Sequence, residues 1–378
     1  MKVHNIMYGS LPTFSSQQLA ALDKVAKWLK SGTGDQQVFR LFGFAGTGKT
    51  TIARHLAAEL NGPVVYAAYT GKAAHVMQQN GCEGATTIHQ LIYSWERKRD
   101  GSFLGELNAE SDAADAVLIV VDECSMVDEV VAKDLMSFGR PILVLGDPAQ
   151  LAPVKGEGFF TDAKPDVMLT EVHRQAKNSP IQRLAMDVRE GRSLIRGTYG
   201  TSRVVVLDDL DTEDILGADQ VIVGRNDTRL SYNSVIRESL GFKSALPCIG
   251  DRLVCRQNDH RLQIYNGGLY RVIDLPEGKS PHGYMPLMLQ SLDHAGSREV
   301  RVLINPDEFL HPGRAVEAKH YGRTQHFDFG YALTVHRAQG SQWSNVFIVD
   351  ESEVFRASPQ KWLYTAITRA IDRVTILV

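Results

Sequence analysis

One eight-residue stretch constrains the fold of this chain more than any other. Gly43-Phe44-Ala45-Gly46-Thr47-Gly48-Lys49-Thr50 matches the pattern G-x-x-x-x-G-K-[ST] in full, after the apolar run Val38–Phe42 and before a helix expected over Thr51–Leu60. Glycines let backbone N–H groups close around phosphate oxygens, and the start of a helix adds a positive dipole. The pattern predicts a nucleoside-triphosphate site in an α/β fold. Its expected nucleotide-binding residues are Gly43, Ala45, Gly46, Thr47, Gly48, Lys49, Thr50 and Thr51.

A second motif supplies the carboxylates that such a site needs. The buried-strand candidate Val117–Val121 ends in Asp122 and Glu123. We expect Asp122 and the Thr50 hydroxyl to hold Mg²⁺, and Lys49 to reach the terminal phosphates of ATP. Glu123 is then placed to orient and deprotonate an attacking water.

Apolar runs separated by helical segments continue along the chain and predict a parallel sheet covered by helices. The first series of runs is Val38–Phe42, Val64–Ala68, Val117–Val121 and Ile142–Leu145, and the second is Val204–Leu207, Val221–Val223, Val346–Val349 and Val374–Val378. The repetition favours two α/β core domains, which we place at residues 1–175 and 176–378.

Two segments interrupt this alternation. Residues 93–116 carry a charged turn between strand candidates, which predicts a hairpin insertion in the first domain. Residues 245–325 are rich in Gly and Pro, with short alternating stretches, which is typical of a small antiparallel β unit. We expect the α/β pattern to resume at Phe329.

Several classes of protein are disfavoured by composition. No Asn is followed by Lys, so the guanine-reading motif of GTPases is absent, and the four cysteines form no C-x-x-C pair. No apolar run is long enough to span a bilayer, so we expect a soluble, cytoplasmic protein without a membrane partner. The net charge of −3 gives no basic excess, so a nucleic-acid site would require basic residues to gather in one cleft.

Further motifs distinguish among phosphate-loop proteins. Gln150 follows the strand candidate Ile142–Leu145, where a polar side chain can sense the terminal phosphate. Three more motifs are Glu171-Val172-His173-Arg174-Gln175, the segment from Thr334 to Gln342, and Tyr364-Thr365-Ala366-Ile367-Thr368-Arg369-Ala370. With Phe14–Gln18, Ala68–Ala74 and Thr86–His89, they resemble in order the motifs of superfamily 1 helicases of the RecD-like and Dda-like branch.

That resemblance implies a fold of two RecA-like domains, with the 245–325 segment as a small β-barrel. It also implies the activity of an ATP-dependent DNA helicase that moves 5′→3′ along single strands and separates duplex at a fork. Arg174 and Arg369 correspond to arginine fingers, and Gln18, Gln339 and Gly340 to further nucleotide contacts. The implied DNA contacts are Thr70, Lys72, His89, Thr334 and His336. The hairpin is the candidate wedge, and the expected partners are single-stranded and forked DNA with replication or repair proteins. Tyr69 departs from the proline common at its position.

The motifs leave two other activities open. One is a single-strand translocase that displaces proteins without unwinding, and the other is a DNA-binding subunit whose ATP site is regulatory. Aromatic residues also have two interpretations, base stacking or packing. They are Trp95, Phe103, Trp343 and Tyr364.

Overall fold

A computed structural model of the chain describes residues 14–32, 36–97, 103–152, 158–171, 179–259, 261–277, 283–293, 299–312 and 324–378. Its first half is built on a six-stranded parallel sheet. In spatial order the strands are β3 (Thr86–Thr87), β2 (Val64–Ala68), β6 (Leu118–Asp122), β7 (Ile142–Gly146), β1 (Val38–Gly43) and β8 (Val167–Leu169). The four predicted apolar runs of this half all lie in this sheet, which confirms a mixed α/β fold with a parallel sheet.

Helices cover both faces of the first sheet, which explains why both faces of its central strands are mainly apolar. One face packs against α1 (Ser16–Ser31), α2 (Lys49–Ala58) and α3 (Gly71–Gln79). The other face packs against α4 (Ile88–Ile92), α5 (Asp112–Asp115) and α6 (Glu129–Met136). Successive residues of β6 divide between the two cores, because side chains alternate across a strand: Leu118 and Val120 face α1–α3, and Ile119 and Val121 face the other side.

A two-stranded hairpin leaves the first half after α4. Strands β4 (Tyr93–Arg97) and β5 (Phe103–Leu107) pair antiparallel, with Tyr93 opposite Leu107. The side chains of residues 95–97 and 103–104 lie outside the described set, as does the turn between the strands.

A second six-stranded sheet forms the core of the other half. Its order is β17 (Ala332–Thr334), β11 (Gln220–Val223), β18 (Trp343–Val349), β19 (Ala370–Leu377), β10 (Ser202–Val205) and β9 (Gly197–Tyr199), parallel except for β9. Its helices are α8 (Pro180–Arg189), α12 (Val335–Ala338) and α13 (Pro359–Ile367) on one face, and α9 (Thr212–Leu216) and α10 (Asn226–Ser239) on the other. Single 3₁₀ turns occupy Cys124–Met126, Leu207–Asp209 and Ser352–Val354.

A five-stranded antiparallel sheet with its own apolar core lies between β11 and β17 in the sequence. Its order is β15 (Val300–Ile304), β14 (Met285–Ser291), β13 (Leu269–Asp274), β12 (Arg252–Cys255) and β16 (Phe327–Phe329), with α11 (Asp307–Leu310) beside it. The sheet is curled, so that its two edge strands, β15 and β16, approach each other. The N–H of Gln325, just before β16, donates to Leu303 O of β15 at 2.8 Å. Strand β16 lies beyond the expected boundary at residue 325, so this unit ends later than the composition indicates.

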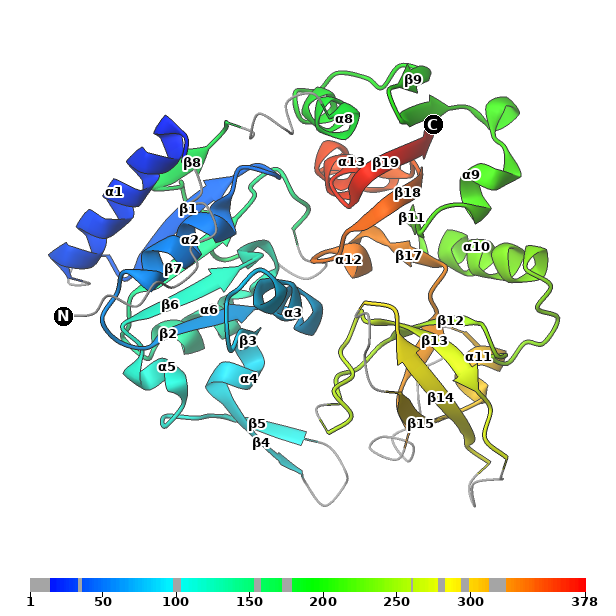
Figure 1. Ribbon diagram of the computed structural model, residues 1–378, viewed down its shortest axis with the longest axis horizontal. Helices are drawn as coiled ribbons and strands as arrows, with labels where there is room; N and C mark the ends of the chain where they lie inside the picture. The colour runs from blue at the N-terminus through cyan, green and yellow to red at the C-terminus, as the bar shows by residue number, and fades with distance from the viewer. Residues whose placement is uncertain are drawn as a thin grey trace, which may run out of the picture.

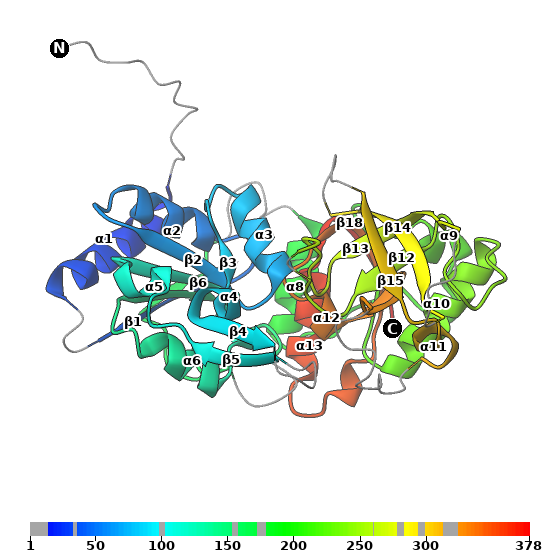
Figure 2. The same cartoon turned by 90° about the horizontal axis from the view of Figure 1, so that it is seen from below.

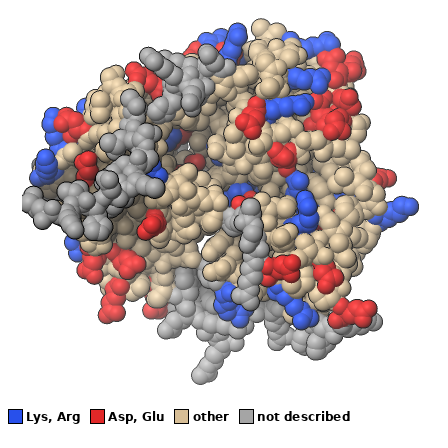
Figure 3. Space-filling view, in the orientation of Figure 1, with Lys and Arg blue, Asp and Glu red and all other residues tan. Residues whose placement is uncertain are grey.

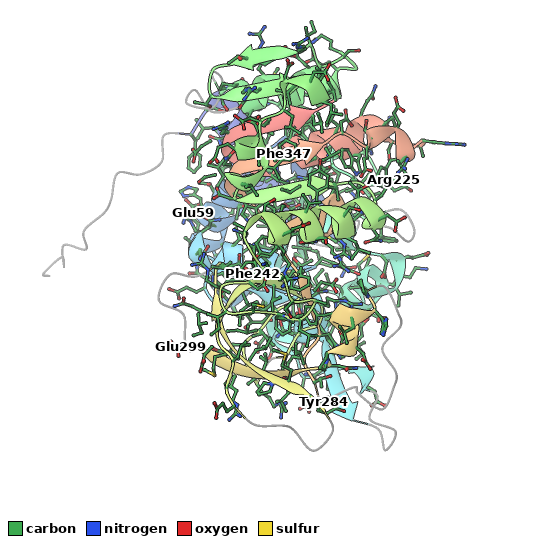
Figure 4. The ribbon with its side chains drawn as sticks, turned by 90° about the vertical axis from the view of Figure 1, so that its right-hand side faces the viewer. Glu59, Arg225, Phe242, Tyr284, Glu299 and Phe347 are labelled. Atoms are coloured by element: carbon green, nitrogen blue, oxygen red, sulfur yellow. The ribbon has the colours of Figure 1, made fainter. Side chains whose placement is uncertain are left out.

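The two parallel-sheet halves lie side by side, with the antiparallel sheet and the hairpin at the same edge of the molecule in Figure 1. Figure 2 shows α3 and α12 at the junction of the halves. Figure 4 shows the outer side of the second half, where Phe347 lies in the sheet behind α10 and Phe242 lies between α10 and the antiparallel sheet. Among the described residues, no helix is both long and apolar enough to cross a bilayer.

Candidate active site

The phosphate loop connects β1 to α2 at the carboxyl edge of the first sheet. Gly48 precedes α2 with φ +82°, a left-handed conformation that residues with a side chain adopt at a cost. The Lys49 ammonium donates to Gly43 O at 2.8 Å and to Phe44 O at 3.2 Å. The first N–H groups of α2 have no partner within the helix, so the loop and the helix start form a concave set of donors suited to phosphate.

The two metal-binding candidates are in direct contact. The Thr50 hydroxyl at the start of α2 donates to Asp122 Oδ2 at the end of β6, at 2.6 Å. The other oxygen of Asp122 accepts from the Glu123 N–H at 2.8 Å. A hydroxyl and a carboxylate at this spacing fit Mg²⁺, which prefers oxygen ligands and retains several waters. No group of three or more His, Cys, Asp or Glu side chains suited to a metal ion occurs in the described part of the chain.

Glu123 is held in an unusual backbone conformation. Its φ is +50°, and Gln263 is the other non-glycine residue with a positive φ among those described. Burial raises the pKa of the Glu123 carboxyl, Asp122 raises it further, and the guanidinium of Arg369 opposes the shift. A carboxylate with a raised pKa and a constrained backbone at a cleft is a strong candidate for a general base.

The second half supplies Arg369 to the same cleft. This cleft has a volume of about 700 Å³, and Lys49, Thr50, Asp122, Glu123, Gln150 and Arg369 all line it. Arg369 is 3% exposed, and its guanidinium donates to Thr365 O at 3.1 Å and to Ser341 O at 3.3 Å. Gln150 is also buried, and its Oε1 has no hydrogen-bond partner in the described structure.

Two further nucleotide-binding candidates lie at the contact between the halves. Gln339 is buried and donates to Leu151 O at 2.8 Å, across the junction. Gly340 has φ +75°, and a β carbon there would lie 3.1 Å from Ala73 Cβ and 3.3 Å from Thr70 Oγ1. The absence of a side chain at residue 340 therefore allows the halves to approach closely.

Gln18, the adenine-reading candidate, contacts the phosphate loop from α1. Its Nε2 donates to Thr47 O at 3.0 Å, and its Oε1 accepts from the Ser15 N–H in a capping box. Gln18 thus ties the first turn of α1 to the loop.

The expected DNA contacts occupy separate places in the fold. Thr70 caps α3, and Thr334 ends β17. The Lys72 ammonium lies 2.7 Å from Asp293 Oδ1 and 5.1 Å from the ring centroid of Trp343, so it bridges the halves. The structure brings Lys72 into the wall of the same cleft as Lys49.

His89 and His336 each lie against aromatic rings, on different halves. His89 is 5.6 Å from Tyr69 and 5.9 Å from Tyr93, ring centroid to centroid. His336 is 5.8 Å from Phe355. Burial lowers the pKa of both imidazoles, so they are neutral at pH 7.

Two expectations from the sequence concern basic residues. Arg174 lies outside the described residues, so its role stays a prediction. On the face shown in Figure 3, Lys and Arg side chains are scattered over both halves among acidic ones, whereas the cleft itself is lined by Lys49, Lys72, Arg252, Arg271 and Arg369 together with four carboxylates.

Two residues contact both halves: Tyr364, for which the sequence left base stacking and packing open, and Asp293, which the sequence did not single out. Tyr364 is buried at the junction, and its hydroxyl donates to Asp147 Oδ2 at 2.7 Å, which indicates packing and hydrogen bonding and not base stacking. Its signal was its place in the motif that contains Arg369. Asp293, the partner of Lys72, lies in the bend that follows β14 of the antiparallel sheet, where no motif marks it.

A phosphate loop, an adjacent carboxylate pair and an arginine from a second parallel-sheet half define a phosphate-loop nucleotide-binding protein of two α/β halves. The profile described as "AAA domain" matches residues 13–206, and the profile described as "UvrD-like helicase C-terminal domain" matches residues 329–377. The chain therefore belongs to the AAA-domain family, in the group of superfamily 1 helicases that includes RecD-like and Dda-like proteins.

Individual proteins agree with this assignment. The chain is 27% identical to the ATP-dependent RecD2 DNA helicase of Deinococcus radiodurans, over 95% of this chain and 48% of that protein. It is 33% identical to the ATP-dependent DNA helicase dda of Enterobacteria phage T4, over 40% of this chain and 37% of that protein. The chain thus spans about half the length of the RecD2 helicase that it matches.

Solved structures share the fold. A Pif1 helicase structure that addresses DNA unwinding at forked duplex DNA superposes with a TM-score of 0.58 at 18% identity, covering 96% of this chain and 92% of that one. A Bacteroides Pif1 bound to single-stranded DNA gives a TM-score of 0.57 at 17% identity, with the same coverage.

Proposed function

We propose that this chain is an ATP-dependent DNA helicase that moves 5′→3′ along single-stranded DNA and separates duplex at a fork. The observation that carries the proposal is the meeting of Glu123 from one half with Arg369 from the other in a cleft that also contains the Thr50–Asp122 pair. The DNA helicase activity of the RecD2 and dda relatives supports it.

The architecture that we propose is two RecA-like domains, residues 1–175 and 176–378. The hairpin of residues 93–116 and the small barrel of residues 245–325, extended to include β16, are insertions in them. The two six-stranded sheets, parallel except for β9 in the second, and the curled antiparallel sheet support this division.

We propose that ATP hydrolysis uses residues from both domains. The Lys49 ammonium and the loop N–H groups bind the phosphates, and Gln150 senses the terminal one. Glu123 takes a proton from the attacking water, and Arg369 offsets the charge that develops on the transferred phosphoryl group. Thr50 and Asp122 would hold Mg²⁺, which supplies charge neutralisation at the phosphates when bound. Because Arg369 comes from the other half, hydrolysis depends on closure of the cleft.

Single-stranded DNA is the proposed track. The contacts that we propose are Thr70, Lys72, His89, Thr334 and His336, with neutral imidazoles acting through stacking and hydrogen bonds. Lys72 reaches a strand only when its ion pair with Asp293 opens. The hairpin of β4 and β5 is the proposed wedge at a fork, and the setting is cytoplasmic DNA replication, repair or recombination alongside proteins of those processes.

Strand displacement on tailed duplexes tests the proposal. We would compare wild type, Lys49→Ala and the surface control Lys27→Ala on duplexes with a 5′ or a 3′ tail, and measure ATPase with and without single strands. Unwinding from the 5′ tail alone, lost only in Lys49→Ala, is expected. Unwinding only from a 3′ tail would refute the polarity. Stimulated ATPase without unwinding would identify a translocase, and ATPase that single strands do not stimulate would identify a regulated subunit.

A further inference from the structure

The hydroxyl of Tyr364 joins two functional loops of the first half from a helix of the second. It donates to Asp147 Oδ2 at 2.7 Å and accepts from the Ala45 N–H at 3.3 Å. Tyr364 belongs to α13 and is 2% exposed, so these bonds form away from water. Burial raises the pKa of this phenol, which keeps its proton in place as a donor.

Each of the two bonds reaches a loop that the proposed chemistry needs. Ala45 is part of the phosphate loop, whose N–H groups face the phosphates. Asp147 begins the loop that carries Gln150, and its Oδ1 accepts from the Ala149 N–H at 3.0 Å. The Tyr364 hydroxyl therefore fixes the position of the phosphate loop relative to that of Gln150.

Neighbouring residues of α13 extend this connection to Arg369. The Thr365 hydroxyl accepts from the Leu151 N–H at 2.8 Å, so two consecutive residues hold the loop from Asp147 to Leu151. The Thr365 carbonyl in turn accepts from Arg369 Nε at 3.1 Å. One helical turn thus anchors both the Gln150 loop and the arginine that faces Glu123.

A second contact from the same half reinforces the phosphate loop. The guanidinium carbon of Arg189 in α8 lies 3.7 Å from the ring centroid of Phe44, a cation–π contact beside Ala45. Helices α8 and α13 pack together in one core. The phosphate loop is therefore contacted across the junction by two helices that share one packed core.

We propose that Tyr364 is a positioning residue that couples the phosphate loop to Gln150 and Arg369, so that closure of the cleft aligns all three. This inference rests on the proposed ATPase function. It assigns Tyr364 no contact with the reacting atoms. Loss of its hydroxyl should leave nucleotide binding nearly intact and slow the hydrolytic step.

Tyr364→Phe removes the hydroxyl and keeps the ring. The matched control is Tyr199→Phe, because the exposed Tyr199 hydroxyl also donates one hydrogen bond, to Ile195 O at 2.7 Å, outside the cleft. We expect the strand-stimulated kcat of Tyr364→Phe to fall about 10-fold, with KM for ATP changed less than about 3-fold, as for loss of a hydrogen bond to a charged group. Tyr199→Phe should match wild type.

A double-mutant cycle and hydrogen exchange separate positioning from general destabilisation. Combining Tyr364→Phe with Asp147→Asn should slow kcat little beyond either single change. Amide exchange in peptides containing Ala45 and Gln150 should quicken in Tyr364→Phe without nucleotide, with the thermal midpoint near that of Tyr199→Phe. Wild-type kcat and exchange in Tyr364→Phe, or additive effects in the cycle, would overturn the inference. Absence of ATPase activity in wild type would refute the proposed function instead. The amide-exchange measurement would still test the positioning role of Tyr364.

Discussion

Lys72 and Asp293 form an ion pair across the two halves, with 2.7 Å between Nζ and Oδ1. Both side chains are largely buried, at 11% and 14% exposure. The second oxygen of Asp293 accepts from the Leu269 N–H at 2.9 Å, so the carboxylate is fixed to the antiparallel sheet. Because Lys72 stands on α3, this pair connects the antiparallel sheet to the first half beside the nucleotide cleft.

Asp293→Asn should weaken the closed arrangement of the halves. Removing one partner of a buried pair leaves the other charge unpaired. This destabilises the folded state by about 3–5 kcal/mol when the remaining charge cannot reach water. Here the halves can separate and let water reach Lys72, so we expect a loss of about 1–2 kcal/mol in urea unfolding and a larger radius of gyration in solution scattering. Asp23→Asn breaks the exposed Lys27–Asp23 pair and should cost less than about 1 kcal/mol. Equal losses in the two variants would contradict this prediction.

The sequence predicts local parts of this molecule better than contacts between its halves. The loop from Gly43 to Thr50 and the Asp122–Glu123 pair are contiguous motifs at strand ends, so parallel strands bring them together in any such sheet. The Lys72–Asp293 and Tyr364–Asp147 contacts join residues 221 and 217 positions apart, and they depend on how two halves dock. No local periodicity encodes that docking.

The end of the antiparallel sheet shows a second limit of sequence patterns. Strand β16 is three residues long, which is too short to display an alternating pattern. Its pairing with β12 therefore could not be predicted from the sequence. The alternation of Leu118 and Ile119 between two cores is equally invisible, because both faces of β6 are apolar.

The acid side of the pH profile of ATPase activity should fall at a pH above 4.5, the ordinary carboxyl pKa. The reason is that burial raises the pKa of Glu123 and the base acts only when it is ionised. We expect kcat to fall as pH drops through that raised value. Between the unfolded and folded pKa the folded state binds more protons, so stability contributed by this group falls as pH rises. Glu123→Gln should therefore be more stable than wild type at pH 8 while losing at least about 100-fold in kcat. Equal unfolding midpoints across pH would show that the carboxyl is not desolvated.

Because His89 and His336 are neutral, the affinity for single-stranded DNA should not change with pH near neutrality. Burial lowers their pKa values below the ordinary 6.5, so both rings are mainly neutral at pH 7 and above. In the interval below 6.5 the unfolded chain binds more protons, and the stability contributed by these rings rises with pH and is fully present above 6.5. Fluorescence anisotropy at constant ionic strength should show a flat single-strand affinity from pH 7 to 8. A rise in affinity on lowering the pH to 7 that His89→Gln abolishes would contradict neutral stacking.

Gly340→Ala should impair closure of the cleft beyond its effect on stability. The backbone at Gly340 has φ +75°, which disfavours alanine by about 1 kcal/mol, and the added methyl would lie 3.1 Å from Ala73 Cβ and 3.3 Å from Thr70 Oγ1. Because α3 is packed on the first sheet, the methyl pushes the halves apart and moves Arg369 away from Glu123. We expect kcat/KM for ATP to fall about 10-fold or more, since small misplacements of catalytic groups are expensive.

Gly241→Ala separates backbone strain from the steric effect. Gly241 follows α10 with φ +88°, and a β carbon there meets nothing within 4 Å. Both variants should lose about 1 kcal/mol in urea unfolding, because alanine is disfavoured in the left-handed region at each position. Only Gly340→Ala should lose ATPase activity. Wild-type kinetics in Gly340→Ala would show that hydrolysis does not require the close approach of residue 340 to α3, and equal kinetic losses in the two variants would attribute the defect to strain.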